Sequence, residues 1–184
     1  VRQTGDGGYV VGGYTNSYGA GGIDFWLVKT NAYGNKIWDK TYGGIYDDIA
    51  YSVQQTSDGG YIVAGYTSSF GAGYEDFWLV KTDSNGNKIW NKTYGGADSD
   101  YAYSAQQTSD GGYILAGCKY LSDADHFDVW LVKTDSSGNM QWNQTTGGTG
   151  DDEAYSVQQT RDNEYIITAS TDSFSASRDI WLVK

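Results

Sequence analysis

The sequence has no proline, and it has one cysteine, one histidine and one methionine in 184 residues. The single cysteine, Cys118, cannot form a disulfide within the chain, and one cysteine with one histidine excludes the usual zinc sites. Because proline is absent, the 26 glycines indicate turns rather than a disordered Pro/Gly-rich tract. An aromatic content of 16% also argues against disorder.

Basic residues are scarce as well. Twelve lysines and arginines against 23 aspartates and glutamates give a formal net charge of -11. Such a charge repels phosphate backbones and anionic membrane surfaces, so nucleic acid is not an expected partner. No apolar run approaches the ~20 residues that cross a bilayer, so this segment is not expected to insert into a membrane. The sequence opens on Val1, and we expect it to be a fragment of a longer protein.

A repeat of 52 residues organises the chain. One threonine recurs with this period, and the tetrapeptide Trp-Leu-Val-Lys begins four times at nearly the same spacing. A second tryptophan recurs in three of the repeats, so that all seven tryptophans belong to two repeated positions. The recurring residues are Thr4, Thr56, Thr108 and Thr160, then Trp26, Trp78, Trp130 and Trp181, then Trp38, Trp90 and Trp142.

Each repeat is predicted to hold four short antiparallel strands, which we call a, b, c and d in chain order. In the second repeat, alternating apolar and polar residues indicate strands near 50–56, 61–68, 76–82 and 88–94. The Asp58-Gly59 step is a strong signal for a hairpin between a and b, and residues 83–87 form a turn between c and d. No helix is predicted anywhere.

A unit of about 50 residues with four strands favours a β-propeller blade over a solenoid coil. One such sheet cannot bury both of its faces, whereas stacked blades cover each other, and the repeated tryptophans are the natural groups between them. The predicted units are blades at 1–44, 45–96 and 97–148, and a fourth at 149–184 that lacks strand d, so that about 3.5 blades are present. Three ways of completing the ring remain as alternatives. The chain could form a four-bladed ring, missing chain could supply further strands, or copies could assemble into a ring of about 7–8 blades.

Three stretches of the second repeat carry a family resemblance. They are DGGYIVAGYT (58–67), DFWLVKTD (76–83) and GNKIW (86–90), and together they resemble the blades of archaeal and bacterial cell-surface β-propeller repeat proteins. The spacing from Asp83 to Trp90 is also similar to the tryptophan-docking motif of quinoprotein-type propellers, but it is one residue shorter and gives no support for a quinone cofactor. The resemblance implies an extracellular or cell-surface location.

The loops between strands b and c vary, whereas the a–b turns are nearly constant. Alternating strand directions place the b–c loops on one face together with the linkers from d to the next a. Variable loops on a constant scaffold are where binding residues usually lie. The predicted binding residues on this face are Tyr18, Tyr74, Glu75, Tyr120, Asp123, Asp125 and His126.

The linkers on the same face are acidic. If strand a is innermost, Asp48, Asp100 and Asp152 would lie near the mouth of a central channel, where carboxylates and carbonyls could hold Ca²⁺. The alternative interpretation is that they are solvated carboxylates that keep the protein soluble. Another set of repeated aspartates, each two residues before a tryptophan, is interpreted as structural. They are Asp24, Asp76, Asp128 and Asp179.

No catalytic constellation is found. His126 has no recognised nucleophile motif beside it, and Cys118 occupies a position held by Tyr14 and Tyr66 in earlier repeats. Two glycosylation sequons, at Asn91 and Asn143, occur at about the frequency that chance gives. The sequence therefore predicts a non-enzymatic module that binds a protein or glycan at the cell surface. The alternatives are a propeller enzyme acting on polysaccharide and a structural surface-layer or filament component.

Overall fold

The computed structural model describes residues 1–174 and 177–184, so two residues of the last b–c loop lie outside the described part. Within the described residues there are fifteen strands and no helix, which confirms the all-β class. The strands are β1 (Arg2–Gln3), β2 (Tyr9–Thr15), β3 (Asp24–Thr30), β4 (Lys36–Tyr42), β5 (Asp48–Gln55), β6 (Tyr61–Thr67), β7 (Asp76–Thr82), β8 (Lys88–Tyr94), β9 (Asp100–Gln107), β10 (Tyr113–Leu121), β11 (His126–Thr134), β12 (Met140–Thr146), β13 (Asp152–Gln159), β14 (Tyr165–Thr171) and β15 (Asp179–Val183).

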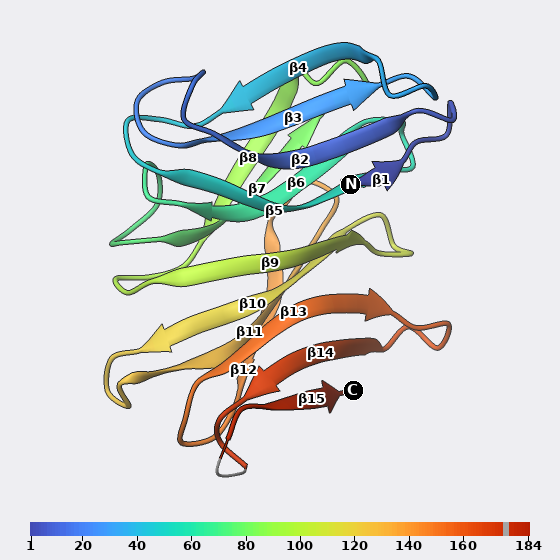
Figure 1. Ribbon diagram of the computed structural model, residues 1–184. Coiled ribbons are helices and arrows are strands. Elements are labelled where there is room, and N and C mark those ends of the chain that lie inside the picture. Colours follow the sequence, from blue (N-terminus) through green and yellow to red (C-terminus); the bar gives the residue numbers. More distant parts are fainter. Residues whose placement is uncertain (175–176) are drawn as a thin grey trace.

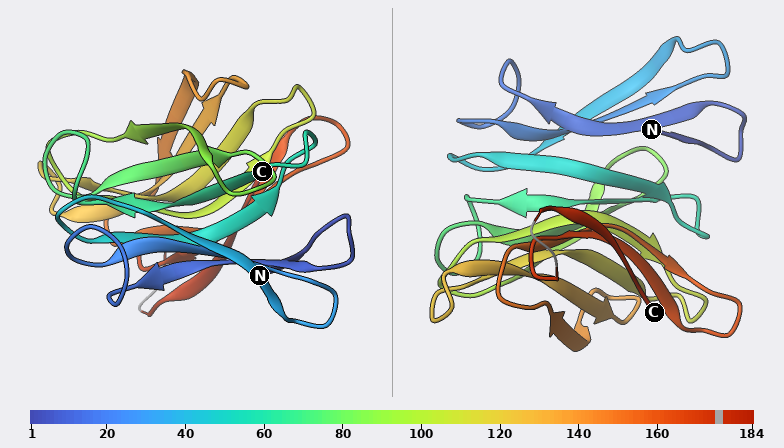
Figure 2. Two further views of the ribbon diagram at one scale, coloured as in Figure 1. Left: turned by 90° about the horizontal axis from the view of Figure 1, so that it is seen from above. Right: turned by 60° about the horizontal axis from the view of Figure 1, so that its bottom comes forward.

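Consecutive strands form four antiparallel sheets, which are β1–β4, β5–β8, β9–β12 and β13–β15. In the second repeat the ends of the predicted strands agree with β5–β8 to within two residues. The sheets follow one another through the molecule, from the N-terminal sheet to the C-terminal sheet (Figure 1). Each sheet packs against its neighbour or neighbours along the chain, as two further views also show (Figure 2).

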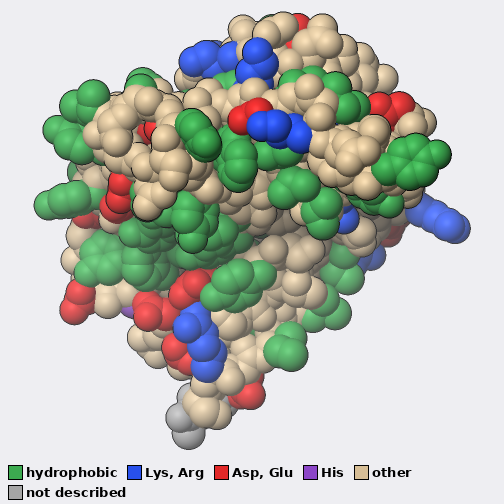
Figure 3. All heavy atoms as spheres, turned by 45° about the horizontal axis from the view of Figure 1, so that its top comes forward, with side chains coloured by type: hydrophobic (Ala, Val, Ile, Leu, Met, Phe, Trp, Pro, Cys, Tyr) green, Lys and Arg blue, Asp and Glu red, His purple; other side chains and the backbone are tan. Residues whose placement is uncertain are grey.

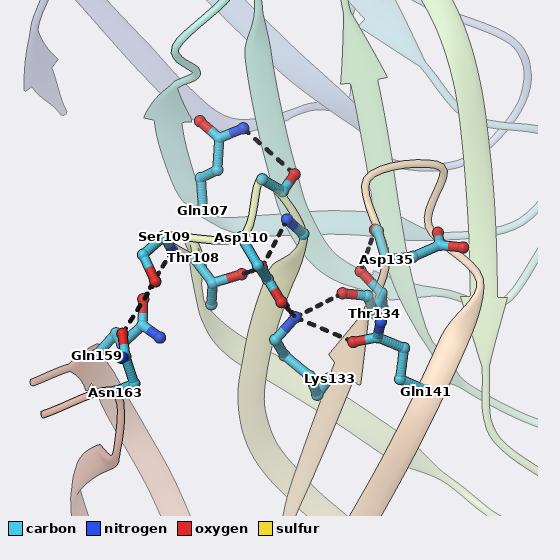
Figure 4. Close-up of polar contacts among 12 residues, drawn as sticks. Gln107, Thr108, Ser109, Asp110, Lys133, Thr134, Asp135, Gln141, Gln159 and Asn163 are labelled. Atoms are coloured by element: carbon cyan, nitrogen blue, oxygen red, sulfur yellow. Dashed lines mark hydrogen bonds and ion pairs between the residues drawn. The ribbon is translucent and has the colours of Figure 1, made fainter.

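A polar cluster fixes the turn between strands a and b. In the third repeat Asp110 accepts hydrogen bonds from the Thr108 hydroxyl at 2.5 Å and from the Gly112 backbone N–H at 2.9 Å. The ammonium group of Lys133, which is buried, lies 2.9 Å from the same carboxylate (Figure 4). Gly111 has a φ of 82°, a conformation that glycine adopts without strain. This cluster explains why the lysine of the Trp-Leu-Val-Lys tetrapeptide recurs together with the Asp-Gly step.

Aromatic rings fill the seams between successive sheets. The ring of Phe25 in the first sheet lies 4.5 Å from Trp78 in the second, and Phe77 in the second lies 4.6 Å from Trp130 in the third. Trp78 is completely buried. The three hydrophobic clusters of the described residues each span one such seam. The prediction that these tryptophans pack between neighbouring sheets is confirmed.

The strands a lie next to one another along the inner side of the stack. Backbone amides of one strand donate to side chains of the preceding one: Gln107 N–H to Gln54 Oε1 and Gln159 N–H to Gln106 Oε1, both at 2.7 Å. These strands border a polar cavity of about 450 Å³. Its lining includes Arg2, Gln3, Gln54, Gln106 and Gln158.

The two end sheets expose faces that inner sheets bury. Val11 in β2 is 38% exposed, whereas the equivalent Val63 in β6 is completely buried. At the other end Leu182 in β15 is 62% exposed, whereas the equivalent Leu79 in β7 is completely buried. The four sheets thus form an open stack that is not closed into a ring (Figure 1).

Candidate binding face

A row of tyrosine rings runs across β5, β6, β9 and β13. We call it the tyrosine row, and it consists of Tyr51, Tyr66, Tyr101, Tyr103 and Tyr155. Neighbouring ring centroids lie 5.0 Å apart for Tyr66 and Tyr101, and 5.2 Å apart both for Tyr51 and Tyr103 and for Tyr103 and Tyr155. Tyr51 and Tyr66, at 6.1 Å, close the set. The row therefore connects the second, third and fourth sheets.

Three of these tyrosines stand at β-bulges. The pairing of β5 with β6 shifts between Ala50 and Ser52, so Tyr51 has no opposite residue, and the same shift occurs at Tyr103 in β9 and Tyr155 in β13. A bulge turns the extra residue out of the regular alternation of a strand. The repeated bulge thereby aligns one tyrosine of each inner strand with its neighbours.

Carboxylates border the tyrosine row. Tyr101 donates its hydroxyl to Glu75 Oε2 at 3.2 Å, and Tyr155 donates to Glu153 Oε2 at 2.7 Å. Burial raises the pKa of Tyr66 to about 12 and also raises that of Tyr103, so these hydroxyls stay protonated at neutral pH. Tyr51 and Tyr155 are 48% and 49% exposed. Half-exposed rings beside fixed carboxylates form a surface that is both apolar and rich in hydrogen-bonding groups.

The predicted binding residues are divided among separate loops. Tyr18 and Tyr74 are 65% and 70% exposed, and Tyr74 lies in the loop that also carries Glu75. Glu75 is held by Ser99, whose hydroxyl donates to it at 2.5 Å, and it is the predicted residue that contacts the tyrosine row directly. On the face drawn in Figure 3, hydrophobic side chains, a class that includes tyrosine there, form a band across the middle with acidic groups beside it.

The hairpin of β10 and β11 holds the other predicted residues, at the ends of the two strands and in the loop between them. Tyr120 donates its hydroxyl to Asp125 Oδ1 at 2.5 Å, and Asp123 is exposed. His126 has Nδ1 3.0 Å from the carbonyl oxygen of Ala124 and Nε2 3.3 Å from Asp128 Oδ1. Both ring nitrogens thus face oxygen atoms. The loop is held together by its own polar contacts.

The linker aspartates of strand a are buried. Asp48, Asp100 and Asp152 are all 0% exposed, so the interpretation of these residues as solvated carboxylates is wrong. The physical reason is that each begins strand a inside a seam, where backbone amides of the linker donate to it, as Gly44 N–H does to Asp48 at 2.9 Å. The neighbouring Asp47 instead accepts the Ile23 N–H of the preceding repeat at 2.9 Å.

Each of these aspartates lies close to an aspartate of strand c in the preceding sheet. We call Asp24 and Asp48 the first acidic pair, Asp76 and Asp100 the second, and Asp128 and Asp152 the third. A glycine stands at each meeting point: a Cβ on Gly43, Gly95 or Gly147 would lie between 1.6 and 2.8 Å from an oxygen of both carboxylates. Burial raises the pKa of Asp24, an effect to which the charge of Asp48 adds, and burial raises that of Asp100 to about 6.

The remaining candidates lie away from the tyrosine row. Asn91 is half-buried on β8, and Asn143 is exposed on β12, where its Oδ1 accepts the Trp130 indole N–H at 3.2 Å. Cys118 is buried, and burial raises the pKa of its thiol. The described residues contain no group of three or more His, Cys, Asp or Glu side chains arranged to hold a metal ion. They also include no helix of the length and apolarity that spanning a membrane requires.

The tyrosine row was not predicted, although a signal for it exists. Tyr51, Tyr103 and Tyr155 recur with the 52-residue period inside strand a. The bulge recurs opposite Gly65 in β6 and Gly117 in β10, and also opposite Ala169 in β14. A tyrosine that recurs in the predicted inner strand is therefore the pattern that could have identified the row.

Comparison with known proteins adds evidence on the fold. No family model matches the chain, and no curated protein matches it. Among solved structures, a protein of unknown function from Bacteroides caccae is similar over 95% of this chain, with a TM-score of 0.53 and 10% sequence identity. The match covers 58% of that protein's chain, so this sequence spans a little over half of its length. At this identity the likeness concerns the fold alone.

Proposed function

We propose that the four sheets are blades of a β-propeller. Support comes from the order of the strands, in which strand a of each repeat is innermost and borders a shared polar cavity. Further support comes from the end sheets, which expose faces that the inner sheets bury. In every later sheet, one face packs against the sheet before it; in the first sheet this face is exposed. In the last sheet the opposite face is exposed. The two end faces therefore complement each other head to tail.

The propeller proposal predicts that isolated chains associate through their end faces. Sedimentation velocity at increasing concentration should show oligomers, and Val11→Lys or Leu182→Lys should weaken the association by placing an ammonium group in an apolar seam. Ile37→Lys is a matched control, because Ile37 is exposed and the equivalent Ile89 of an inner sheet is exposed too. A chain that stays monomeric at every concentration would contradict the proposal.

We further propose that this propeller is a non-enzymatic module that binds glycans. The observation that carries this proposal is the tyrosine row with its flanking carboxylates. Aromatic faces pack against the C–H faces of sugar rings, while carboxylates such as Glu75 and Glu153 accept hydrogen bonds from sugar hydroxyls. Tyr18 and Tyr74, exposed in the b–c loops of the first and second repeats, are further aromatic candidates for sugar contacts. The resemblance to surface repeat proteins supports a cell-surface location for such a module.

Binding should be measured with immobilised neutral oligosaccharides of hexoses and N-acetylhexosamines, followed by calorimetry with the soluble sugars. Tyr51→Ala and Tyr155→Ala should each weaken binding by about tenfold, which corresponds to ~1.4 kcal/mol. Tyr33→Ala is the control, because Tyr33 is 90% exposed in the c–d turn, at the opposite end of the strands from the b–c loops. Unchanged binding in both row variants, or binding of a protein ligand alone, would overturn the glycan proposal.

A further inference from the structure

In three of the four repeats an aromatic ring from the b–c loop lies on the tryptophan of strand c. The ring centroids are 5.2–6.4 Å apart in the pairs Tyr18–Trp26, Phe70–Trp78 and Phe174–Trp181. The equivalent residue of the third repeat is Ser122, which has no ring to place on Trp130. The third repeat therefore differs from the others at one defined place in the fold.

The linker glycines show what takes the place of the ring. A Cβ on Gly44 would lie 3.2 Å from the ring of Phe70, and a Cβ on Gly148 would lie 3.4 Å from the ring of Phe174. Gly96 is the equivalent glycine between the second and third sheets. Among the described residues, its Cβ would meet only the ammonium group of Lys119, at 3.7 Å. A cation thus replaces the aromatic ring in this seam.

Lys119 is itself a departure from the repeat. The equivalent residues of the other repeats are Thr15, Thr67 and Thr171. The Lys119 ammonium lies 4.8 Å from the centre of the Trp130 ring and 3.5 Å from Asp100 Oδ1. An ammonium group has three N–H donors, and the contact with Asp100 uses one of them. The seam therefore holds a positioned cation with donors left for another partner.

A cavity of about 530 Å³ lies at this point between the second and third sheets. Its lining includes Lys92, Lys119, Trp130, Met140 and Asn143. No aspartate or glutamate is among the described lining residues, although the chain has a net charge of -11. The volume falls within the range of roughly 300–1,000 Å³ that is usual for small-molecule sites. Two lysines without an acidic neighbour in the lining favour an anionic ligand.

We propose that this cavity binds an acidic sugar residue, a hexuronate. The ammonium groups of Lys119 and Lys92 pair with its carboxylate. Asn143 accepts the Trp130 indole N–H at 3.2 Å through Oδ1, and its amide nitrogen is left to donate to sugar hydroxyls. Trp130 and Met140 supply apolar surface for the C–H groups of the sugar ring. No residue of the tyrosine row lines this cavity, so the site is a second one that does not rest on the glycan proposal above.

An NMR titration of the ¹⁵N-labelled chain tests the site through the indole N–H signal of Trp130, which the variant Trp130→Phe assigns. The probes are D-glucuronate, D-glucose and acetate at equal ionic strength. D-Glucuronate should shift the Trp130 signal at millimolar concentration. D-Glucose lacks the carboxylate and acetate lacks the sugar ring, so each should bind at least about tenfold more weakly.

Two lining variants locate the binding site. Asn143→Asp keeps an oxygen for the indole N–H, as Asp39 does for Trp26 at 3.1 Å, but adds a negative charge to the lining. Lys92→Gln removes one ammonium group. Each variant should weaken D-glucuronate binding by about tenfold. Lys40→Gln is the matched control, because Lys40 is the equivalent lysine of the first sheet and does not line the cavity.

Tyr51→Ala separates this site from the tyrosine row and should leave D-glucuronate binding unchanged. The dispersion of the NMR spectrum shows whether each variant is folded, and Lys92→Gln decides if Asn143→Asp does not fold, because Lys92 is partly exposed. The proposal is overturned if D-glucuronate leaves the Trp130 signal unshifted, if D-glucose or acetate binds as tightly, or if the folded lining variants bind like the wild type.

Discussion

Tyr42 donates its hydroxyl to the carbonyl oxygen of Gly86 at 2.6 Å and thereby joins strand d of the first sheet to the c–d turn of the second. The relationship recurs one seam later, where Tyr94 donates to Gly138 at 2.7 Å. Trp38 packs against the same turn, because a Cβ on Gly86 would lie 2.7 Å from its ring. Each c–d turn is thus a docking point for the aromatic residues of the preceding sheet.

Adding a methyl group at this docking point should destabilise the protein. In Gly86→Ala the new Cβ meets Trp38, and residue 86 has a φ of 75° that alanine adopts with strain. Gly34→Ala has a similar φ of 81°, but no atom lies within 4 Å of its Cβ, so it measures the backbone strain alone, about 1–2 kcal/mol. Gly86→Ala should cost a further 1–3 kcal/mol or so in urea unfolding. Equal costs for the two variants would show that Trp38 does not pack on the turn.

Two tryptophans of the repeat should differ in their contribution to stability. Trp78 is completely buried between Phe25 and the second sheet, whereas Trp142 is 39% exposed on the outer strand of the third sheet. Trp78→Ala should lower the free energy of unfolding by about 3–5 kcal/mol. Trp142→Ala should lower the free energy of unfolding by clearly less, because the space left by this partly exposed side chain is open to water. Urea titrations compare the two, and a greater loss for Trp142→Ala would contradict the assignment of the core to the seams.

The period of the sequence predicts most of the fold, because each repeat encodes its own strands and turns locally. The Asp58-Gly59 step and the alternation of residues 61–68 depend on neighbours along the chain. The acidic pairs arise differently, since Asp24 and Asp48 belong to different repeats and meet only when two sheets stack. The sequence therefore predicts the two sets of repeated aspartates as separate features, and of the two interpretations of those in strand a, burial in the seam contradicts the solvated one.

The tyrosine row shows a second limit. Strand alternation alone assigns each residue of strand a to one of two faces, and a bulge breaks this rule at a single position. Tyr51, Tyr103 and Tyr155 occupy that position in three sheets. Variation between the repeats points to the b–c loops instead, and of the residues predicted there Glu75 contacts the row directly.

Acid should weaken the a–b turn. Hydrogen bonds from Thr108 and Lys133, then from Gly112, lower the pKa of Asp110 to about 2 from an ordinary value of 3.8. Because the folded value is the lower one, the carboxylate stabilises the fold above pH 4, and this contribution is lost as the pH falls toward 2. Asp110→Asn should therefore lower the melting temperature at pH 7, and the difference from wild type should shrink between pH 4 and pH 2. Asp123→Asn, exposed in a loop, serves as the control; a difference that stays constant with pH would contradict the prediction.

The second acidic pair should show the opposite dependence on pH. Burial raises the pKa of Asp100 to about 6, an effect that the nearby Lys119 only partly offsets. The folded protein then holds a proton that the unfolded chain releases between about pH 4 and pH 6, so this residue makes the fold less stable as the pH rises through that window. Asp100→Asn removes the titration while it keeps an oxygen that can accept the Gly96 N–H. The melting temperature of the wild type minus that of Asp100→Asn should therefore decrease between pH 4 and pH 6 and stay constant above about pH 6. A difference that instead rises with pH would mean that Lys119 outweighs burial in this seam.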